Sequence, residues 1–331
     1  MAVVTLSSGA SFQAPADSTI LDAASKAHIS LPYSCKTGRC STCKCKVING
    51  VTRALRPESG LTDQEKAEGW VLSCVRAADT DVVLEVDDLG GIEIPAAKIF
   101  PCRISEIKPL APDVIRVLLR LPPTADFHFL PGQYIDVIGS NSLRRSYSLA
   151  NANFADRLLE LHIRAVEGGA MSRYWFSQAK PNDLLRLSGP LGTFFLRESA
   201  GLDLIFLATG TGIAPVKAIL ESMVQMSSEQ HSKTATVFWG GRDSQDLYFN
   251  VADIPGSHTY IPVHSRPSDD WTGAMGYVQD VLLATKPDLS NAAVYACGSE
   301  AMIHSAKALL VEAGLPANRF YSDAFVSSGT N

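Results

Sequence analysis

The sequence has no apolar run that approaches the ~20 residues needed for a membrane-spanning helix. No Lys or Arg precedes Lys26, so the N-terminus lacks the charged start of a signal peptide. Basic residues are not in excess: 29 Lys and Arg face 34 Asp and Glu, and the net charge of −5 argues against general nucleic-acid binding. The seven histidines are scattered, without a metal-ligand spacing such as H-x3-H. We therefore expect a cytoplasmic globular protein that binds neither nucleic acid nor a membrane.

Internal repeats and low-complexity segments are also absent, and 331 residues suggest two or three domains. A first block, residues 1–93, ends in an alternating run at 82–86 that predicts a strand. Pro95 and Pro101 then bracket a linker. The first block is therefore expected to form a domain of its own.

Two further blocks differ from each other in pattern. Residues 101–198 hold short apolar runs, such as 114–119 and 134–138, that are broken by Pro and Gly; this predicts a small antiparallel β-barrel. Residues 202–331 alternate apolar strands, the first at 204–208, with helical patterns. Such alternation indicates βαβ units and a parallel sheet.

Four of the seven cysteines lie within eleven residues, and in a reducing compartment such clustering indicates metal binding. Cys35, Cys40 and Cys43, followed by Cys74, give the spacing C-x4-C-x2-C…C, which is typical of a plant-type [2Fe-2S] cluster. Gly38 would let the loop bend back. Zinc is the alternative, but zinc sites usually show two short C-x2-4-C pairs and this chain has one.

Other residues of this block have plainer interpretations. Cys45 would share the face of Cys43 on a strand and is expected to be a buried small residue, as is Cys102. The cluster loop is basic, with four cationic side chains: Lys36, Arg39, Lys44 and Lys46. They form either a solvated surface or a docking patch for an acidic partner protein.

The second block contains Arg145-Ser146-Tyr147-Ser148, which resembles the R-x-Y-S motif of the ferredoxin-NADP reductase superfamily. The resemblance implies that these four residues bind FAD. A guanidinium can pair with the pyrophosphate, Tyr147 offers a flat face to the isoalloxazine ring, and Ser148 offers a hydroxyl to its redox edge. Arg144 competes with Arg145 for the phosphate role.

About twenty residues later, a Gly-rich turn opens a helical pattern at Gly169, Met171 and Ser172. Backbone N–H groups at such a helix start can bind a phosphate. A plain capped helix is the alternative. We expect these three residues to complete the FAD site.

The third block carries Gly210, Thr211 and Gly212 between a strand and a helix, which is the context that a pyrophosphate-binding turn requires. Pro215 stands where G-x-G-x-x-G has its third glycine, a departure that resembles the ferredoxin reductase superfamily. That resemblance places Cys297, followed by Gly298, beside the nicotinamide carbon that gives up hydride. A buried core position is the alternative for Cys297.

The segment after the next strand bears on whether the coenzyme carries a 2′-phosphate, as NADPH does. Arg242 could clamp the 2′-phosphate of NADPH, or Asp243 could accept the ribose hydroxyls of NADH. The residues alone leave both options open. Similar proteins mostly use NADH, so NADH is expected and NADPH is possible.

Taken in order, the three blocks resemble reductases with an N-terminal plant-type ferredoxin domain. The resemblance implies a multidomain fold: a β-grasp ferredoxin domain of the α+β class, an antiparallel β-barrel FAD domain, and an α/β parallel-sheet NAD domain. It also implies that Phe325 stacks on the flavin where nicotinamide enters, although a core aromatic closing the last strand is the alternative. Ser148, Cys297 and Phe325 are thus the residues expected at the reacting atoms.

Two branches of this family fit the motifs. One reduces the CDP-4-keto-6-deoxyglucose 3-dehydrase of 3,6-dideoxysugar synthesis, and Phe129–Tyr134 and Phe320–Phe325 resemble it. The other serves aromatic-ring oxygenases, and the loop at 35–46 resembles it as well. We expect electrons to pass from NADH through FAD to the cluster, and then to a sugar dehydrase or, alternatively, to an oxygenase component.

Functions of other classes also remain open at this point. A flavin-dependent disulfide or quinone reductase would not need the cluster. A ferredoxin-like binding module would not need the turn at Gly210.

Overall fold

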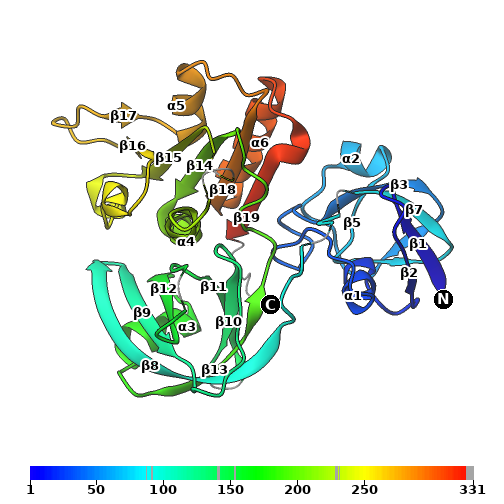
Figure 1. The fold of residues 1–331 in the computed structure, drawn as a ribbon, viewed down its shortest axis with the longest axis horizontal. Helices are drawn as coiled ribbons and strands as arrows, with labels where there is room; N and C mark the ends of the chain where they lie inside the picture. Colours follow the sequence, from blue (N-terminus) through cyan, green and yellow to red (C-terminus); the bar gives the residue numbers. More distant parts are fainter. Residues whose placement is uncertain are drawn as a thin grey trace. The chain divides into compact units, whose positions relative to one another are not determined.

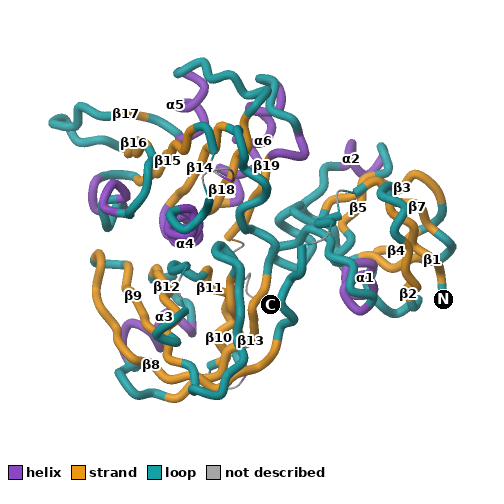
Figure 2. The backbone as a smooth tube through the Cα atoms, in the orientation of Figure 1, coloured by secondary structure: helices purple, strands orange, loops and turns teal. Residues whose placement is uncertain are grey.

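The computed structural model describes residues 1–86, 88–90, 92–139, 142–152, 154–227, 230 and 232–325. Its chain divides into two compact units, Met1–Ile94 together with the residues from Asp323, and Pro95–Ser322. Figures 1 and 2 show the elements of both units. Within the described residues, no helix has the length and apolar character required to cross a membrane.

The N-terminal unit is a mixed sheet with two short helices. Its sheet has the order β2-β1-β7-β3-β5; β1 runs parallel to β7, and the other pairings are antiparallel. A separate β4-β6 pair lies outside this sheet. The elements are β1 Ala2–Leu6, β2 Ser11–Ala14, α1 Ile20–Lys26, β3 Lys44–Asn49, β4 Thr52–Ala54, α2 Asp63–Ala67, β5 Trp70–Leu72, β6 Arg76–Ala78 and β7 Val82–Glu85. The strand predicted at 82–86 is β7.

Both helices of this unit begin at side-chain caps. Thr19 accepts a hydrogen bond from the Asp22 N–H at the start of α1. Thr62 and Glu65 form a reciprocal capping box at the start of α2. The buried face of α1 packs into the core of the sheet, whereas α2 buries none of its residues.

The second part of the chain is a six-stranded antiparallel sheet with the order β11-β10-β13-β8-β9-β12. An isolated bridge joins Leu149, the residue after β11, to Leu161 in the middle of β12, so the sheet curls toward a closed barrel. The elements are β8 Lys98–Ala111, β9 Val114–Arg120, β10 Tyr134–Ile138, β11 Arg144–Ser148, β12 Leu158–Arg164, α3 Ala170–Ser177 and β13 Leu184–Leu191. The runs at 114–119 and 134–138 are the strands β9 and β10.

The third part is a parallel sheet flanked by helices. Its order is β17-β16-β15-β14-β18-β19, and the pairings among β14, β15, β16, β17 and β18 are parallel. The elements are β14 Asp203–Thr209, η2 Gly210–Gly212, α4 Ile213–Met223, β15 Thr234–Gly241, η4 Ser244–Asp246, η5 Val251–Asp253, β16 Thr259–His264, β17 Ala274–Met275, α5 Val278–Ala284, β18 Ala292–Ser299, α6 Glu300–Glu312, η6 Ala317–Arg319 and β19 Phe320–Phe325. The carboxyl ends of parallel strands lie at the same edge of the sheet, and open α/β sheets bind ligands at that edge.

The expected fold class is confirmed: a β-grasp unit, an antiparallel barrel and a parallel α/β sheet follow one another along the chain. The domain boundaries 1–93, 101–198 and 202–331 stay a prediction, because the barrel and most of the parallel sheet belong to one compact unit, Pro95–Ser322.

Candidate cluster, flavin and coenzyme sites

The four predicted cluster ligands form two thiol pairs. The side chains of Cys35 and Cys40 interact with each other, as do those of Cys43 and Cys74. Among the described residues, no group of three or more Cys, His, Asp or Glu could hold a single metal ion. Two pairs are what a [2Fe-2S] cluster needs, since each of its irons takes two cysteines.

Backbone N–H groups point at these sulfurs. The Thr37 N–H lies 3.4 Å from the sulfur of Cys35, and the Cys35 N–H lies 3.5 Å from the sulfur of Cys40. The hydrogen bond from Cys40, followed by those from Thr37, lowers the pKa of the Cys35 thiol to about 4, against the effect of burial. The contact with Cys35 raises the pKa of Cys40, and the contact with Cys74 raises the pKa of Cys43, so one thiol of each pair favours the deprotonated form that metals bind.

Gly38 lets this loop close tightly. Its φ is +78°, and a Cβ there would lie 2.4 Å from the carbonyl oxygen of Pro57. Its own carbonyl accepts the Gly60 N–H at 2.9 Å, and its N–H bonds the sulfur of Cys74. One glycine thus connects the loop of the first three cysteines to the segment that brings the fourth.

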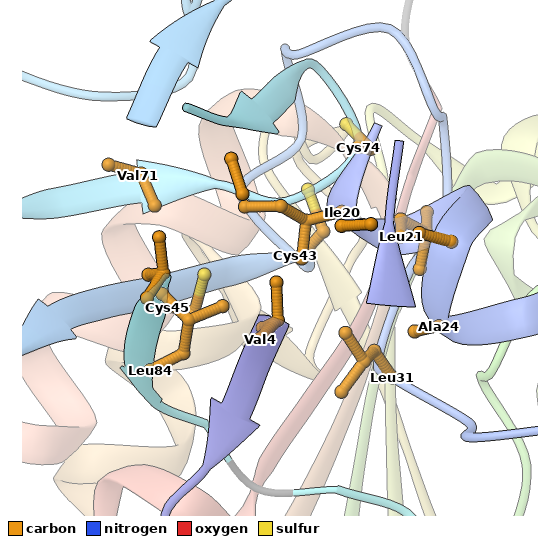
Figure 3. Close-up of a cluster of buried hydrophobic side chains, with 14 of the residues drawn as sticks. Val4, Ile20, Leu21, Ala24, Leu31, Cys43, Cys45, Val71, Cys74 and Leu84 are labelled. Carbon is orange, nitrogen blue, oxygen red and sulfur yellow. The ribbon is translucent and has the colours of Figure 1, made fainter. Parts of the chain in front are cut away.

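Cys43 and Cys74 belong to the hydrophobic core of the N-terminal unit (Figure 3). Cys45, on β3, is in the same core and 1% exposed, and Figure 3 shows its sulfur set apart from theirs. Cys102 is likewise buried, on β8 of the barrel. Both positions match the interpretation of these cysteines as small core residues.

The basic side chains of the cluster loop differ in their surroundings. Lys44 pairs with Glu65 on α2 at 2.7 Å and also lies over the ring of Trp70. Lys46 lies over the same ring, and Lys36 lies 4.4 Å from the ring centre of Tyr33. The positive charge of Lys44 is therefore already balanced within the unit.

The flavin motif is the edge strand β11, antiparallel to β10. Arg145 and Tyr147 share one face of this strand, and the exposed Arg144 lies on the opposite face. Trp175 of α3 donates its indole N–H to the Tyr147 hydroxyl at 2.9 Å. Because α3 therefore lies on the face of Arg145, the alternation favours Arg145 over Arg144 as the phosphate ligand.

The other two motif residues lie on the face of Arg144. Ser146 donates to Asp136 of β10 at 2.7 Å, which anchors the strand. Ser148 is buried, with 8% of its surface exposed. Its hydroxyl lies where β11 ends and the bridge to β12 begins.

The start of α3 has the geometry of a phosphate site. Gly169 is the N-cap and makes no side-chain capping bond, so the first N–H groups of the helix keep their hydrogen-bonding capacity. The Ser172 hydroxyl accepts the Val166 N–H at 2.9 Å and can still donate. Met171 is 4% exposed and packs in the barrel core, so only its backbone can reach a cofactor.

Close glycine contacts build the coenzyme turn. A Cβ on Gly212 would lie 2.2 Å from the carbonyl oxygen of Cys297, and a Cβ on Gly298 would lie 2.2 Å from the hydroxyl of Thr209. The Thr209 hydroxyl also accepts the Ser299 N–H at 3.0 Å. The turn Gly210–Gly212 and the last residues of β14 and β18 therefore interlock at the carboxyl edge of the sheet, where Cys297 is buried.

Arg242 is held by Asp246 rather than projecting freely. Its Nε and Nη2 lie 2.8 and 3.0 Å from the two carboxylate oxygens of Asp246. The hydrogen bond from Arg242 lowers the pKa of the buried Asp246 to about 2. Asp243 accepts the Gln245 N–H and caps η4.

Arg164 was missed by the sequence interpretation. It lies at the end of β12, pairs with Asp246 at 3.1 Å, and a Cβ on Gly210 would lie 3.3 Å from its guanidinium. The barrel thus places a cation beside the coenzyme turn. Nothing near Arg164 in the sequence marks it, because its partners are some 46 and 82 residues away.

Phe325 ends β19 and is 38% exposed. A side chain of this exposure does not close a core. Its stacking on the flavin stays a prediction.

Known families match the three parts of the chain in the same order. Residues 4–79 match the family described as 2Fe-2S iron-sulfur cluster binding domain, residues 101–196 the oxidoreductase FAD-binding domain, and residues 206–308 the oxidoreductase NAD-binding domain. The chain is 40% identical over 326 residues to the CDP-6-deoxy-L-threo-D-glycero-4-hexulose-3-dehydrase reductase of Yersinia pestis, covering 97% of each chain. The chain belongs to the ferredoxin reductases with an N-terminal [2Fe-2S] domain.

Members of this family with other acceptors are also similar. The reductase component of the naphthalene 1,2-dioxygenase/salicylate 5-hydroxylase systems of a Ralstonia species is 31% identical, with 94% of each chain covered. A cytochrome P450 reductase from Amycolatopsis has the same fold, with a TM-score of 0.76 and 26% identity over 99% of this chain and 100% of that chain.

This ferredoxin reductase is an NAD(P)H-dependent oxidoreductase that uses FAD and a [2Fe-2S] cluster. When bound, FAD supplies the exchange between hydride transfer and single-electron transfer. The chain's own residues bind and orient the cofactors, and no acid–base dyad is needed for that task. A flavin enzyme without a cluster and a non-enzymatic binding module are both excluded by the three matched domains.

Proposed function

We propose that this reductase takes electrons from NADH and delivers them, through FAD and the cluster, to a sugar dehydrase that acts on a CDP-linked 4-keto-6-deoxyhexose. The observation that carries the proposal is the 40% identity, over nearly the whole of both chains, to a reductase named for that dehydrase. A cytoplasmic location is part of the same proposal.

The residues are assigned as follows. Cys35, Cys40, Cys43 and Cys74 bind the cluster; Arg145, Tyr147, Ser148 and the start of α3 bind FAD; Gly210–Gly212, Cys297 and Gly298 bind the nicotinamide coenzyme. The paired thiols, the face of β11 that Arg145 and Tyr147 share, and the interlocked glycines support these roles. Ser148 lies on the other face and is assigned from its buried place at the end of the strand. Arg164 is added to the coenzyme site because it lies beside Gly210.

The pairing of Arg242 supports NADH over NADPH. A 2′-phosphate would have to compete with the Asp246 carboxylate, which accepts from Arg242 at both oxygens. The test is kcat/KM for NADH and for NADPH with ferricyanide as acceptor. A higher value for NADPH would overturn this preference.

A second acceptor class has its own support, since the Ralstonia reductase component is 31% identical over 94% of each chain. The deciding measurement is the rate of electron delivery to a purified CDP-hexulose dehydrase with its substrate and, in parallel, to an oxygenase component. Reduction of the dehydrase alone supports the proposal, whereas reduction of the oxygenase component alone replaces it.

A further inference from the structure

Lys217 links the flavin strand to the coenzyme helix within the Pro95–Ser322 unit. It lies on α4, which begins directly after the turn Gly210–Gly212. Its Nζ donates a 2.8 Å hydrogen bond to the carbonyl of Ala150. Ala150 is two residues beyond Ser148, the last residue of β11. One side chain therefore bonds the helix that opens at the coenzyme turn to the end of the flavin motif.

Glu221 adds a second tie from the same face of α4. It stands four residues after Lys217 and accepts from it at 2.6 Å. Its other carboxylate oxygen accepts the Ala152 N–H at 3.0 Å. The barrel segment from Ala150 to Ala152 is thus held at two points by one helix.

Two side chains of β12 and one from the segment after β15 extend the hydrogen-bond network around Lys217. Glu160 of β12 lies 3.4 Å from Lys217 and accepts from the Nε2 of His162 at 2.8 Å. The Nδ1 of His162 lies 3.1 Å from the hydroxyl of Tyr248, in the segment after β15. The side chains of Lys217, Glu160 and His162 are 17%, 14% and 3% exposed. Buried polar networks hold a defined geometry when every member is paired.

We propose that Lys217 is a positioning residue for hydride transfer, because it fixes the distance between the flavin motif and the coenzyme turn. This inference rests on the proposed FAD and coenzyme roles of those two motifs. The hydride carries both electrons from the coenzyme to the flavin, and no bond to Lys217 forms or breaks. Its effect comes through placement, and a misplacement of about 1 Å can cost ~10²-fold in rate.

The test compares Lys217→Met with a matched control, Arg157→Met. Arg157 is also a cation bonded to backbone carbonyls, those of Pro122 and Ala125, but its hydrogen bonds to the described residues lie within the barrel part of the chain. We expect both variants to keep FAD and to bind NAD+ within about twofold of wild type. In Lys217→Met alone, the limiting rate of flavin reduction by NADH should fall about ten- to a hundredfold, and hydrogen exchange at the Ala152 amide should become faster.

Two further variants complete the design. Lys217→Arg keeps a donor for Ala150 and should recover most of the rate, whereas Glu221→Gln removes a charge but keeps an acceptor for Ala152 and should give a smaller loss. If Lys217→Met does not fold, Lys217→Arg and Glu221→Gln carry the test through the same rate and exchange measurements.

Either of two results would overturn the inference, and a third would overturn the proposed function. A wild-type limiting rate in Lys217→Met or, where that variant does not fold, in Glu221→Gln, would overturn it, as would equal losses in Lys217→Met and Arg157→Met. A wild-type protein whose flavin is not reduced by NADH or NADPH would instead overturn the proposed function.

Discussion

Cys74 lies in a turn that side chains outside the cluster hold in place. The buried Glu58 accepts the Leu72 N–H at 2.8 Å and pairs with Arg76 at 2.9 Å. Arg56 donates to the carbonyl of Cys74 at 3.1 Å. Contacts of the protein itself therefore position the fourth ligand, which reduces the ordering that cluster binding must impose.

We predict that Cys74→Ser loses the cluster and keeps FAD. Cys74 and the flavin motif belong to different units, so NADH-to-ferricyanide activity should persist. The measurement is iron content and the visible absorbance spectrum, with Cys45→Ala as the control that keeps its iron, since Cys45 lies in the core. A wild-type iron content in Cys74→Ser would remove Cys74 from the ligand set.

For Phe325→Ser, we predict altered coenzyme affinity or a changed NADH/NADPH preference, with FAD still bound. The physical reason is that an aromatic ring covering the flavin would compete with nicotinamide for the same face. Phe176, which is 37% exposed against 38% for Phe325, provides a matched Phe176→Ser control. If both coenzymes behave with Phe325→Ser as with wild type, Phe325 has a structural role.

At the scale of elements, α2 is stabilised by the side-chain cap at its N-terminus rather than by the packing of a buried face. It has five residues and buries none of them, yet Glu65 both completes the capping box and takes the charge of Lys44. Through Glu65, the N-terminal cap of α2 is therefore linked to Lys44 of the cluster loop.

Thr62→Ala should destabilise the N-terminal unit by about 1 kcal/mol, the usual cost of losing such a cap. Thr62→Ser keeps the hydroxyl and should restore most of that free energy of unfolding. Denaturant titration followed by loss of cluster absorbance measures both. Equal midpoints for Thr62→Ala and wild type would show that the capping box contributes nothing.

Local patterns were enough to predict most elements. The apolar runs at 114–119, 134–138 and 204–208 became β9, β10 and β14, because strand burial leaves a short-range signature. The cysteine spacing likewise predicted four ligands, which the structure arranges in two pairs that the spacing did not predict. Contacts such as Lys217 to Ala150 left no such signature, since their partners lie 67 residues apart. Met171 shows a related limit: the motif marks its backbone, while its side chain packs in the core.

At the scale of the whole molecule, the proposed route delivers electrons from the cluster to another protein. Lys36 and Arg39 lie in that loop beside the exposed Thr37. Lys44 and Lys46 follow them, although Lys44 already pairs with Glu65. An acidic acceptor surface would complement this region, and such complementarity acts mainly on the encounter rate.

We predict that acceptor reduction slows steeply with salt, because the Debye length falls from ~10 Å at 0.1 M to ~3 Å at 1 M. Internal transfer from NADH to FAD and cluster should change little. A Lys36→Glu, Lys44→Glu double variant should slow acceptor reduction and leave ferricyanide turnover intact. The charge-matched control is a Lys98→Glu, Lys233→Glu double variant, which changes two exposed lysines of the other unit. A flat salt profile, with the double variant as fast as wild type, would mean that the basic loop is only solvated.

Two of the four iron ligands, Cys43 and Cys74, are also part of the hydrophobic core of the N-terminal unit. Metal binding is then coupled to folding, so the population of opened chains rises when iron is scarce. Opened chains are the ones that proteases degrade. The supply of iron–sulfur clusters in the cell would in this way set how long each molecule survives as well as whether it can pass electrons.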